Sequence, residues 1–573
     1  MQKYYEYQCS FYLLLLQYKI KIWAYSHYGR ANNNSDSKSD NKLDFETVLT
    51  MEIGGFGKYQ LINILLLAIP TAISGFMAGD YIFTAARLPH RCFIPYCDGI
   101  DPEFSPDWIH NAVPATSTGY DECHHYAFVN VTEKFGNGTC PASMFDRNTI
   151  LSCDSYVYER TNSVVYDFGL ECAEWLRALA GTLNSVGGMV CLPLAGFISD
   201  YFGRRTSTVF FSFNIALVGF IRSFSVNYYM YVSLQFLQVA LGGGTFSAAY
   251  ILATEIVGPK YRVVTSATMS SMFAFGQVLL GTIAFLITEW RTLSLVLFTP
   301  AFLLISYIWL LTESYRWLLS KNKHEKAKNA LERAARMNGK KISESAMNYL
   351  LTAIPNEKEK NETVKERNLF VRVLKSKILL RRCCTTPVWW ITTTFVYYGL
   401  SINSVNLTGN MYLNYIATAA IEIPGYWTAA LLLDRMGRKV VLFSGYMVCA
   451  FCCLSFAFVS NTYYGLSLIL FLTGKFCIAL VMTSIYLFTS ELYPTSQRHS
   501  FLAFSSMVGR IGSIASPLTP PLMMYWEGIP TVMFGSLAVI SALLVLTQPE
   551  TLGLKLPDTF EDAEKIQSLK RWI

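Results

Sequence analysis

The sequence predicts an all-α membrane protein with twelve transmembrane helices in two pseudo-symmetric six-helix lobes and a large disulfide-bonded extracellular loop. Composition is the first reason, because 52% of the 573 residues are hydrophobic and only 15% are charged, whereas soluble proteins carry about 25% charged residues. The second reason is a charged motif that occurs once in each half of the chain. The third is a cluster of cysteines in one long polar segment.

Long apolar segments fit twelve spans, each of which needs about 20 residues. In the first half these segments are 61–83, 177–199, 207–225, 228–251, 264–287 and 293–311, and in the second half they are 385–404, 411–433, 439–459, 463–488, 499–523 and 529–547. Several contain Gly or Pro. Membrane helices tolerate these residues because neighbouring helices satisfy the freed backbone groups.

The spans divide the chain into five expected parts. These are a cytoplasmic extension at 1–43, the first lobe at 44–311 with an extracellular loop at 87–172, an intracellular loop at 312–384, the second lobe at 385–547, and a cytoplasmic tail at 548–573. The extension is rich in Asn, Ser and Asp and is expected to be disordered. The intracellular loop is expected to be helical, because apolar residues recur at helical spacing from Leu318 onward.

Basic residues predict the orientation of the chain. Residues 316–382 hold eighteen Lys or Arg, whereas 87–172 hold only five. Because cytoplasmic loops carry the excess of basic residues, 316–382 is expected inside the cell. Both termini then also lie in the cytoplasm of a multi-pass plasma-membrane protein. The net charge of +7 therefore reflects which loops lie on the cytoplasmic side. We expect a lipid bilayer as partner and no nucleic acid.

Cysteines and sequons support an extracellular position for 87–172. The six cysteines in this segment predict three disulfides, with the pairing left open: they are Cys92, Cys97, Cys123, Cys140, Cys153 and Cys172. Two glycosylation sequons begin at Asn130 and Asn137. We therefore expect this loop to be both disulfide-bonded and glycosylated.

The two halves share a pattern of charged residues. The first copy is Gly196-Phe-Ile-Ser-Asp200-Tyr-Phe-Gly203-Arg204-Arg205 and the second is Asp434-Arg-Met-Gly437-Arg438-Lys439. Each copy is followed by an acid and a base seven residues apart, which are Glu255 with Arg262 and Glu491 with Arg498. Each half ends on a short acidic element, containing Glu313 or Glu550. A repeated half with charges at the ends of apolar segments is typical of a two-lobed membrane transporter.

With these motifs, the chain resembles the major facilitator superfamily, and within it the organic cation, carnitine and organic anion solute carriers. The resemblance runs from about residue 44 to 560 and is carried by Asp44-Phe-Glu, Gly54-Gly55-Phe56-Gly57-Lys58-Tyr59-Gln60, His90-Arg91-Cys92, Glu313-Ser-Tyr-Arg316-Trp317-Leu318 and Leu552-Gly553-Leu554-Lys-Leu556-Pro557-Asp558-Thr559. The second motif copy departs from the pattern, because Ala430 takes the place of Gly196. The extension before Asp44 departs from it as well.

The resemblance implies a gating latch on the cytoplasmic side. In the first lobe it would be formed by Asp200, Arg204, Glu255, Arg262 and Glu313, and in the second lobe by Asp434, Arg438, Glu491 and Arg498. Such charges close and separate as the two lobes rock. The alternative is that they only fix the topology of the helices.

Three ionisable residues lie inside expected spans, where such residues are functional candidates. They are Glu422, Lys475 and Arg510. A carboxylate can neutralise an ammonium group, and a guanidinium can bind a carboxylate through two hydrogen bonds. In the resembling family, cation carriers have an acid at the position of Glu422, and anion and carnitine carriers have Arg at the position of Arg510. Glu422 with Arg510 therefore suits a zwitterion, unless the charges only pair with each other or with Lys475.

Aromatic rings can bind alkylammonium groups through cation–π attraction. The candidates are Tyr397 and Tyr398 in the seventh span, followed by Phe246 and Tyr250 in the fourth. Most aromatic residues of such a chain must simply pack or lie at the membrane interface. Gln277 in the fifth span could line a cavity or bond a neighbouring helix.

The expected function is polyspecific secondary transport of small organic cations or zwitterions, such as carnitine-like amines, by alternating access. The alternatives are an organic anion exchanger that uses Arg510 and Lys475, and a transporter-like substrate sensor. The sequence contains no phosphate-binding Gly-x-x-x-x-Gly-Lys-Ser/Thr loop and no His-Glu-x-x-His metal motif. We therefore expect no enzyme activity, no cofactor and no metal. Coupling to Na+ or to a counter-substrate and the oligomeric state are left open.

Overall fold

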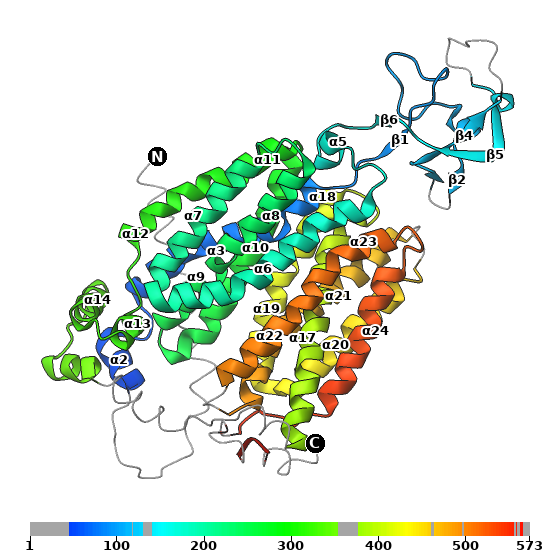
Figure 1. Ribbon diagram of the computed structural model, residues 1–573. Helices are drawn as coiled ribbons and strands as arrows, with labels where there is room; N and C mark the ends of the chain where they lie inside the picture. Colours follow the sequence, from blue (N-terminus) through cyan, green and yellow to red (C-terminus); the bar gives the residue numbers. More distant parts are fainter. Residues whose placement is uncertain are drawn as a thin grey trace.

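The structure is a computed structural model that describes residues 45–116, 119–129, 140–352, 376–459, 463–494, 498–554, 557 and 562–564. Two bundles of long helices lie side by side (Figure 1). A small unit containing all six strands projects from one end of the bundles, and the short helices α2, α13 and α14 lie at the other end.

The first lobe contains six long helical segments. They are α3 (Lys58–Thr84), α6 (Glu174–Phe202), α7 (Arg204–Arg222), α8 (Tyr228–Gly242) continued by α9 (Gly244–Glu255), η2 (Pro259–Tyr261) with α10 (Arg262–Leu286), and α11 (Trp290–Phe298) continued by η3 (Thr299–Ser306) and α12 (Tyr307–Leu310).

The second lobe repeats this arrangement. Its helices are α17 (Lys377–Asn403) with η4 (Ser404–Asn406), α18 (Met411–Ala420) continued by α19 (Glu422–Met436), α20 (Arg438–Phe456), α21 (Tyr464–Leu492), α22 (Arg498–Ala515) continued by η5 (Ser516–Leu518) and α23 (Thr519–Leu522), and α24 (Ile529–Leu546). A separate apolar core lies within each lobe.

Among the described residues, ten helical segments are long and apolar enough to cross a membrane. α7 and α17 occupy the places of the expected third and seventh spans but are not among these ten. α7 begins with two arginines and ends at Arg222, and α17 begins at Lys377 and is rich in Thr. Both helices are therefore too polar to be recognised as spans from apolar composition alone.

The projecting unit is built from three two-stranded antiparallel sheets. The pairs are β1 (His90–Cys92) with β6 (Tyr156–Tyr158), β2 (Ala115–Thr116) with β3 (Gly119–Tyr120), and β4 (His124–Phe128) with β5 (Phe145–Ser152). The short helices α4 (Ile109–Ala112), η1 (Ala142–Met144) and α5 (Val164–Phe168) connect them. Asn130 and Asn137, the predicted glycosylation sites, lie outside the described residues.

All six cysteines predicted to form disulfides are paired in this unit. The bonds are Cys92–Cys153, Cys97–Cys140 and Cys123–Cys172. They enclose a small core of its own that includes Trp108, Val113 and Phe145. The cross-links compensate for the little apolar area that so small a unit can bury.

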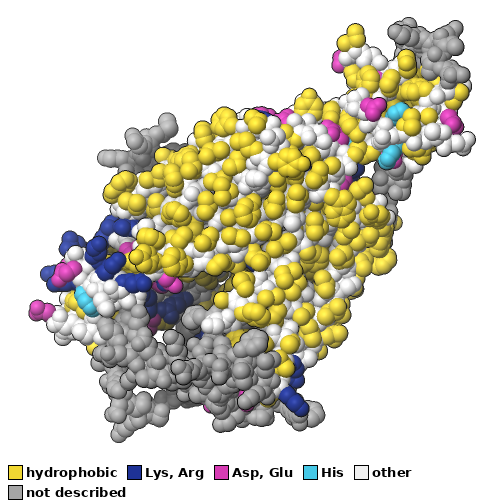
Figure 2. Space-filling model, in the orientation of Figure 1, with side chains coloured by type: hydrophobic (Ala, Val, Ile, Leu, Met, Phe, Trp, Pro, Cys, Tyr) yellow, Lys and Arg dark blue, Asp and Glu magenta, His cyan; other side chains and the backbone are white. Residues whose placement is uncertain are grey.

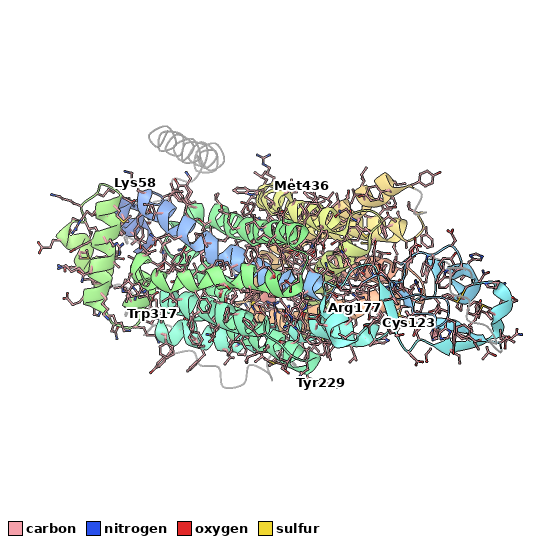
Figure 3. All side chains as sticks on the ribbon, turned by 90° about the horizontal axis from the view of Figure 1, so that it is seen from above. Lys58, Cys123, Arg177, Tyr229, Trp317 and Met436 are labelled. Atoms are coloured by element: carbon pink, nitrogen blue, oxygen red, sulfur yellow. A yellow bond between two sulfur atoms is a disulfide. The ribbon has the colours of Figure 1, made fainter. Side chains whose placement is uncertain are left out.

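The opposite end carries the basic residues. α2 (Phe45–Ile53), α13 (Tyr315–Ser320) and α14 (His324–Met337) pack there beneath the first lobe. Dark blue Lys and Arg side chains gather at this end, while apolar side chains cover the flanks of both lobes (Figure 2). Seen from above, Lys58 and Trp317 lie at one end of the molecule and Cys123 lies toward the other (Figure 3).

A fully buried ion pair holds five helices of the first lobe together. Arg222 of α7 pairs with Asp80 of α3, and both side chains are completely inaccessible. Arg222 also donates to Gln235 of α8 and, over 3.3 Å, to Ser294 of α11. Gln235 in turn donates to Asn184 of α6 over 2.9 Å. The two charges thus neutralise each other inside an apolar lobe, where an unpaired charge would be very costly.

We predict that Arg222→Leu destabilises the protein by about 3–5 kcal/mol, because it leaves the Asp80 carboxylate buried without its cation. The double change Asp80→Leu with Arg222→Leu should recover much of this loss, since no charge remains to be compensated. Thermal unfolding of the purified variants in detergent measures both effects. Equal losses for the single and double variants would contradict the prediction.

Candidate functional site

Glu422 lies at a break within the eighth helical segment. α18 ends at Ala420 and α19 begins at Glu422, two residues before Pro424. Proline has no backbone N–H to donate to the carbonyl four residues earlier, so the helix is interrupted at this point. Broken membrane helices often form binding sites, because their free backbone groups line a cavity.

The Glu422 carboxylate is fully buried and has three partners. Its Oε1 lies 2.9 Å from the Nζ of Lys475 on α21. Its Oε2 accepts hydrogen bonds from Tyr397 over 2.5 Å and from Tyr426 over 2.9 Å. The structure therefore pairs two of the three charged residues that the sequence placed inside spans.

Lys475 is equally well satisfied. Its ammonium group donates to the Tyr397 carbonyl over 2.8 Å and to Ser401 Oγ over 2.6 Å, in addition to contacting Glu422. It also lies 3.7 Å from the centre of the Tyr397 ring. Glu422 and Lys475 thus form a neutral pair inside the second lobe, with no accessible surface on either side chain.

Arg510 of α22 differs from this pair. It is half-buried, and its guanidinium lies near Tyr398, Tyr486 and Cys191. Cys191 belongs to α6, so Arg510 lies at the interface between the two lobes. Within the part of the chain that the structure describes, no Asp or Glu pairs with it. Arg510 therefore leaves a positive charge at the interface.

Aromatic residues from both lobes surround this charge. Phe246 and Tyr250 of α9 pack together with a ring separation of 5.7 Å, and Tyr250 lies near Tyr486 of the second lobe. Tyr397 and Tyr398 meet edge to face at 5.2 Å. The four aromatic residues chosen from the sequence therefore approach one region, although Tyr486 was not among them.

A small cavity lies between the lobes beside Tyr397 and Tyr398. Its lining includes Gln277 together with Tyr397 and Tyr398. It also includes Tyr81 and Tyr415, which the sequence reasoning did not single out. Their positions depend on which face of α3 and α18 is turned toward the other lobe, and this is not visible in a nearly uniform apolar segment.

The lobes are joined at the end near the projecting unit. Phe83, next to the end of α3, stacks on Tyr412 at the start of α18 with a ring separation of 5.5 Å. Tyr412 also meets Phe285 of α10 at 5.7 Å. A Cβ added to Gly281 of α10 would come within 2.7 Å of Ile416, so the helices α10 and α18 touch closely here.

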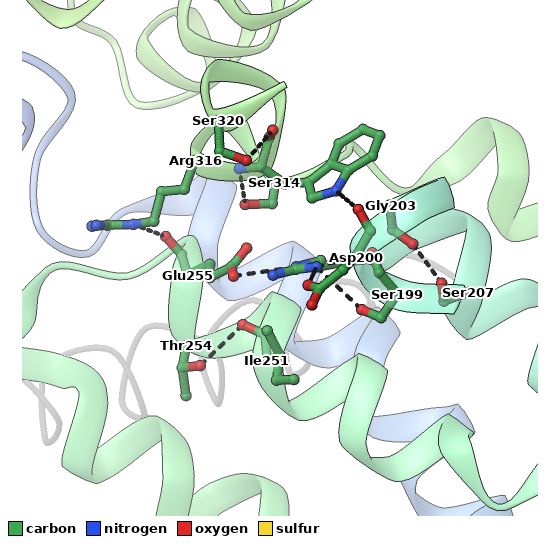
Figure 4. Close-up of polar contacts among 12 residues, drawn as sticks. Ser199, Asp200, Gly203, Ser207, Ile251, Thr254, Glu255, Ser314, Arg316 and Ser320 are labelled. Carbon is green, nitrogen blue, oxygen red and sulfur yellow. Dashed lines mark hydrogen bonds and ion pairs between the residues drawn. The ribbon is translucent and has the colours of Figure 1, made fainter. Parts of the chain in front are cut away.

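At the opposite end, the first lobe gathers the predicted latch residues around Arg204. The Arg204 guanidinium lies 2.7 Å from Asp200 and 3.3 Å from Glu255 (Figure 4). Glu313 accepts hydrogen bonds from the backbone N–H groups of Arg204 and Arg205 over 2.9 and 3.0 Å. These N–H groups open α7 and would otherwise lack partners, and the helix dipole favours an anion there.

The second lobe repeats this geometry. Arg438 lies 3.2 Å from Asp434 and 3.1 Å from Glu491. Glu550 takes the place of Glu313 and accepts from the N–H groups of Arg438 and Lys439, both over 2.9 Å. Glu550 was visible in the sequence as part of an acidic element, but the sequence reasoning did not include it in the latch.

Glycine is required at the turn in both lobes. Gly203 has φ +104° and Gly437 has φ +95°, which are conformations that other residues rarely adopt. A Cβ on Gly203 would collide with the Glu313 carboxylate, and a Cβ on Gly437 would collide with that of Glu550. The repeated Gly-Arg motif thus brings a carboxylate onto the first N–H groups of a helix.

Arg262 pairs with an acid outside the expected latch. It lies 2.8 Å from Glu46 of α2, and Glu46 also accepts two hydrogen bonds from Arg316, over 2.6 and 2.7 Å. Arg498 begins α22 in the second lobe. The structure therefore brings together Asp200, Arg204, Glu255 and Glu313, and it places Arg262 in a separate cluster with the N-terminal helix.

Two carboxyl groups at this end have shifted pKa values of opposite sign. Burial alone would raise the pKa of Glu46, but the hydrogen bonds and charges of Arg316 and Arg262 outweigh it and lower that pKa below its usual 4.5. Burial raises the pKa of Glu313 despite the N–H groups that donate to its carboxylate. Only Glu46 is therefore held firmly in its charged form.

Two lobes of apolar helices, a cavity between them and a repeated charged turn are the features of a membrane transporter. A family model described as Major Facilitator Superfamily matches residues 173–517 and 413–563. The organic cation transporter protein of Drosophila melanogaster is 32% identical over 529 residues, which cover 91% of this chain and 95% of that protein. Organic cation/carnitine transporter 2 of Mus musculus is 29% identical over 92% of this chain and 95% of its own length.

The chain belongs to the major facilitator superfamily, and within it to the organic cation and carnitine solute carriers, as the sequence motifs predicted. Among solved structures, an inward-open conformation of the xylose transporter XylE from E. coli superimposes with a TM-score of 0.60. The match covers 89% of this chain and 100% of that one at 16% identity. This likeness confirms the fold.

We predict that acid weakens the attachment of α2 through Glu46. Its folded-state pKa is lowered, so its stabilising contribution is complete above 4.5 and is lost as pH falls through the lower folded-state value. The melting temperature of the wild type should therefore fall more steeply below pH 4.5 than that of Glu46→Gln. The effect should stay within about 1 kcal/mol, because the side chain is partly exposed.

Glu313 acts in the opposite direction, since its pKa is raised, but it is present in both proteins and cancels in their difference. Glu325→Gln, which changes an exposed carboxylate on α14, is the matched control. Parallel curves for the wild type and Glu46→Gln would show that the pairs with Arg262 and Arg316 do not stabilise the fold.

Proposed function

We propose that the chain is a polyspecific secondary transporter that carries small organic cations or zwitterions across the plasma membrane by alternating access. In this proposal all twelve helical segments cross the membrane, including α7 and α17, and both termini lie in the cytoplasm. The names of the relatives support the substrate class, since they are organic cation and carnitine transporters. Carnitine-like zwitterions are the preferred substrates.

The observation that carries this preference is the charge of Arg510. Glu422 is neutralised by Lys475, so Arg510 gives the region between the lobes a net positive charge. A guanidinium binds a carboxylate through two parallel hydrogen bonds. We therefore assign the substrate carboxylate to Arg510, and its ammonium group to the rings of Tyr398, Tyr250 and Phe246.

Glu422 contributes to this site indirectly. Its carboxylate accepts from the Tyr397 hydroxyl, and the Tyr397 ring packs edge to face on Tyr398, which lies near Arg510. Glu422 and Lys475 thereby fix the aromatic wall. A substrate ammonium group reaches Glu422 only if Lys475 gives up its contact, so we propose Glu422 as a positioning residue first.

An organic anion exchanger is the second candidate, and the same unpaired charge favours it. In this alternative Arg510 alone binds the anion, because Lys475 already contacts Glu422, Ser401 and the Tyr397 carbonyl. The clusters around Arg204 and Arg438 favour a transporter, whose lobes move, and not a passive sensor. The ion pairs of each cluster join helices of one lobe and would hold that lobe rigid while the lobes rock, and separation of these charges during rocking stays a prediction.

We predict that Arg510→Ala lowers carnitine uptake by cells at least tenfold, since two charge-assisted hydrogen bonds to the carboxylate are lost. Tetraethylammonium has no carboxylate, so its uptake should not fall. Arg510→Lys should restore little, because an ammonium group lacks the planar pair of donors. Arg87→Ala, which changes an exposed arginine near the projecting unit, is the control for expression and trafficking.

Each probe is measured with and without Na+, which also decides how transport is coupled. Para-aminohippurate uptake without carnitine uptake would favour the anion exchanger. Carnitine uptake that survives Arg510→Ala would overturn the assignment of the carboxylate to Arg510. A wild type that transports none of the three probes, although present at the cell surface, would favour a sensor.

A further inference from the structure

We propose that Tyr415 and Gln277 form a subsite for a hydroxyl group of the substrate, so that the protein prefers hydroxylated organic ions to the same ions without the hydroxyl. The inference deepens the proposed function, on which it rests for the location of the substrate between the lobes. It concerns a neutral group of the substrate, whereas Arg510 and the aromatic rings concern its charged groups.

The hydroxyl group of Tyr415 is buried without a hydrogen-bond partner. Tyr415 of α18 is only 1% exposed, and none of the residues that the structure describes bonds its hydroxyl oxygen. A buried tyrosine hydroxyl usually finds a partner, because leaving it unpaired after removal from water is unfavourable. Since Tyr415 also lines the cavity between the lobes, a ligand bound there can supply the missing partner.

Gln277 of α10 provides a second polar group with free hydrogen-bonding capacity. Its side chain is 5% exposed and lines the same cavity. Within the described part of the chain, its amide group makes no hydrogen bond to another residue. The sequence left open whether Gln277 lines a cavity or bonds a neighbouring helix, and the structure shows that it lines the cavity.

The two polar groups come from different lobes and lie close to the same face of α3. A Cβ added to Gly79 would lie 2.3 Å from the Tyr415 hydroxyl oxygen. One turn earlier on α3, a Cβ added to Gly75 would lie 3.1 Å from the backbone nitrogen of Gln277. On α10, Gln277 stands one turn before Gly281, where an added Cβ would lie 3.0 Å from the Tyr415 ring. Glycine therefore leaves room for both groups at one part of the cavity.

The chemistry of this pair matches a hydroxyl group. A tyrosine hydroxyl can donate and accept, and a glutamine amide offers both a donor and an acceptor. A substrate hydroxyl can therefore accept from one of the two residues and donate to the other, whereas a carbonyl oxygen has no hydrogen to donate. Neither residue carries a charge, so the pair suits a neutral polar group and not an ammonium or a carboxylate group.

Tyr398 connects this subsite to the residues that bind the charges. It lines the same cavity as Gln277 and Tyr415, and it lies near the Arg510 guanidinium. A short ligand that places its carboxylate at Arg510 therefore extends along Tyr398 toward the two polar groups. The substrate class that follows is a short organic ion with a hydroxyl group on its carbon chain.

The test compares ligands that differ only by one hydroxyl group. The pairs are carnitine with γ-butyrobetaine, choline with ethyltrimethylammonium, and 3-hydroxybutyrate with butyrate. Binding to the full chain purified in detergent is measured from the rise in melting temperature that each ligand produces, so no transport is needed. Because the three pairs are zwitterions, cations and anions, the pair that binds tests the charge preference of the proposed function separately from the hydroxyl subsite.

In the wild type, the hydroxylated member of the pair that binds should bind about two- to tenfold more tightly, as expected for neutral hydrogen bonds made in competition with water. Tyr415→Phe removes only the hydroxyl group and should bring this ratio close to one. Gln277→Leu should lower the ratio as well. Because the Tyr415 hydroxyl has no partner, Tyr415→Phe should not lower the melting temperature of the ligand-free protein.

Tyr412→Phe is the matched control, because it removes a tyrosine hydroxyl from the same helix and Tyr412 is not among the described residues that line the cavity. It should keep the ratio of the wild type. Equal binding of both members of a pair by the wild type would overturn the subsite. An equal loss of affinity for both members in Tyr415→Phe would also overturn it, since Tyr415 would then act by packing alone. Binding of none of the six ligands by the folded wild type would contradict the proposed function and the subsite together.

Discussion

The cost of placing a charge in an apolar helix bundle governs the arrangement of this protein. Two buried acids, Asp80 and Glu422, meet this cost by pairing with Arg222 and Lys475, one pair in each lobe. Both pairs are completed by neutral hydrogen-bonding groups. Arg510 differs from these two pairs, because it lies at the lobe interface beside aromatic residues and pairs with no acid among the described residues. A charge that the fold leaves uncompensated at such a place is best explained by a ligand of opposite charge.

The same constraint also applies at the helix ends that lie opposite the projecting unit. Glu313 and Glu550 come from segments that follow the last helix of each lobe and bind the N-termini of α7 and α20. Each acid thus connects the segment after the last helix of its lobe to the start of the third helix of that lobe. Because Gly203 and Gly437 leave room for these carboxylates, the short repeated motif makes each lobe a mechanical unit. Rocking of two such units requires no rearrangement inside either lobe.

Much of this architecture could be predicted from the sequence. The repeated motif, the positions of the spans, the cysteine-rich loop and the family all followed from local patterns. Asp80 and Arg222 were missed, although each stands inside an expected span and could have been found by the reasoning that singled out Glu422, Lys475 and Arg510.

Partners were less predictable than positions, because they depend on how each helix is rotated about its axis. Glu422 could have faced Arg510, and only the packing of α19 against α21 turns it toward Lys475. Arg262 was expected near the acids of the latch but meets Glu46, which lies more than two hundred residues earlier in the chain. α7 and α17 lie where two spans were expected, but their arginines and threonines make them too polar to be recognised by apolar composition alone, so their crossing of the membrane stays a prediction.

The most direct test of the central claim is competition between two ligands that differ only at the carboxylate. Carnitine and its carboxamide have the same trimethylammonium group and nearly the same shape, so their inhibition constants against labelled carnitine isolate the interaction with Arg510. Our account predicts that the carboxamide binds about ten- to a hundredfold more weakly, the loss expected for a charge-assisted hydrogen bond. Equal inhibition, or stronger inhibition by the carboxamide, would show that the site selects the cation and that the positive charge of Arg510 does not bind substrate.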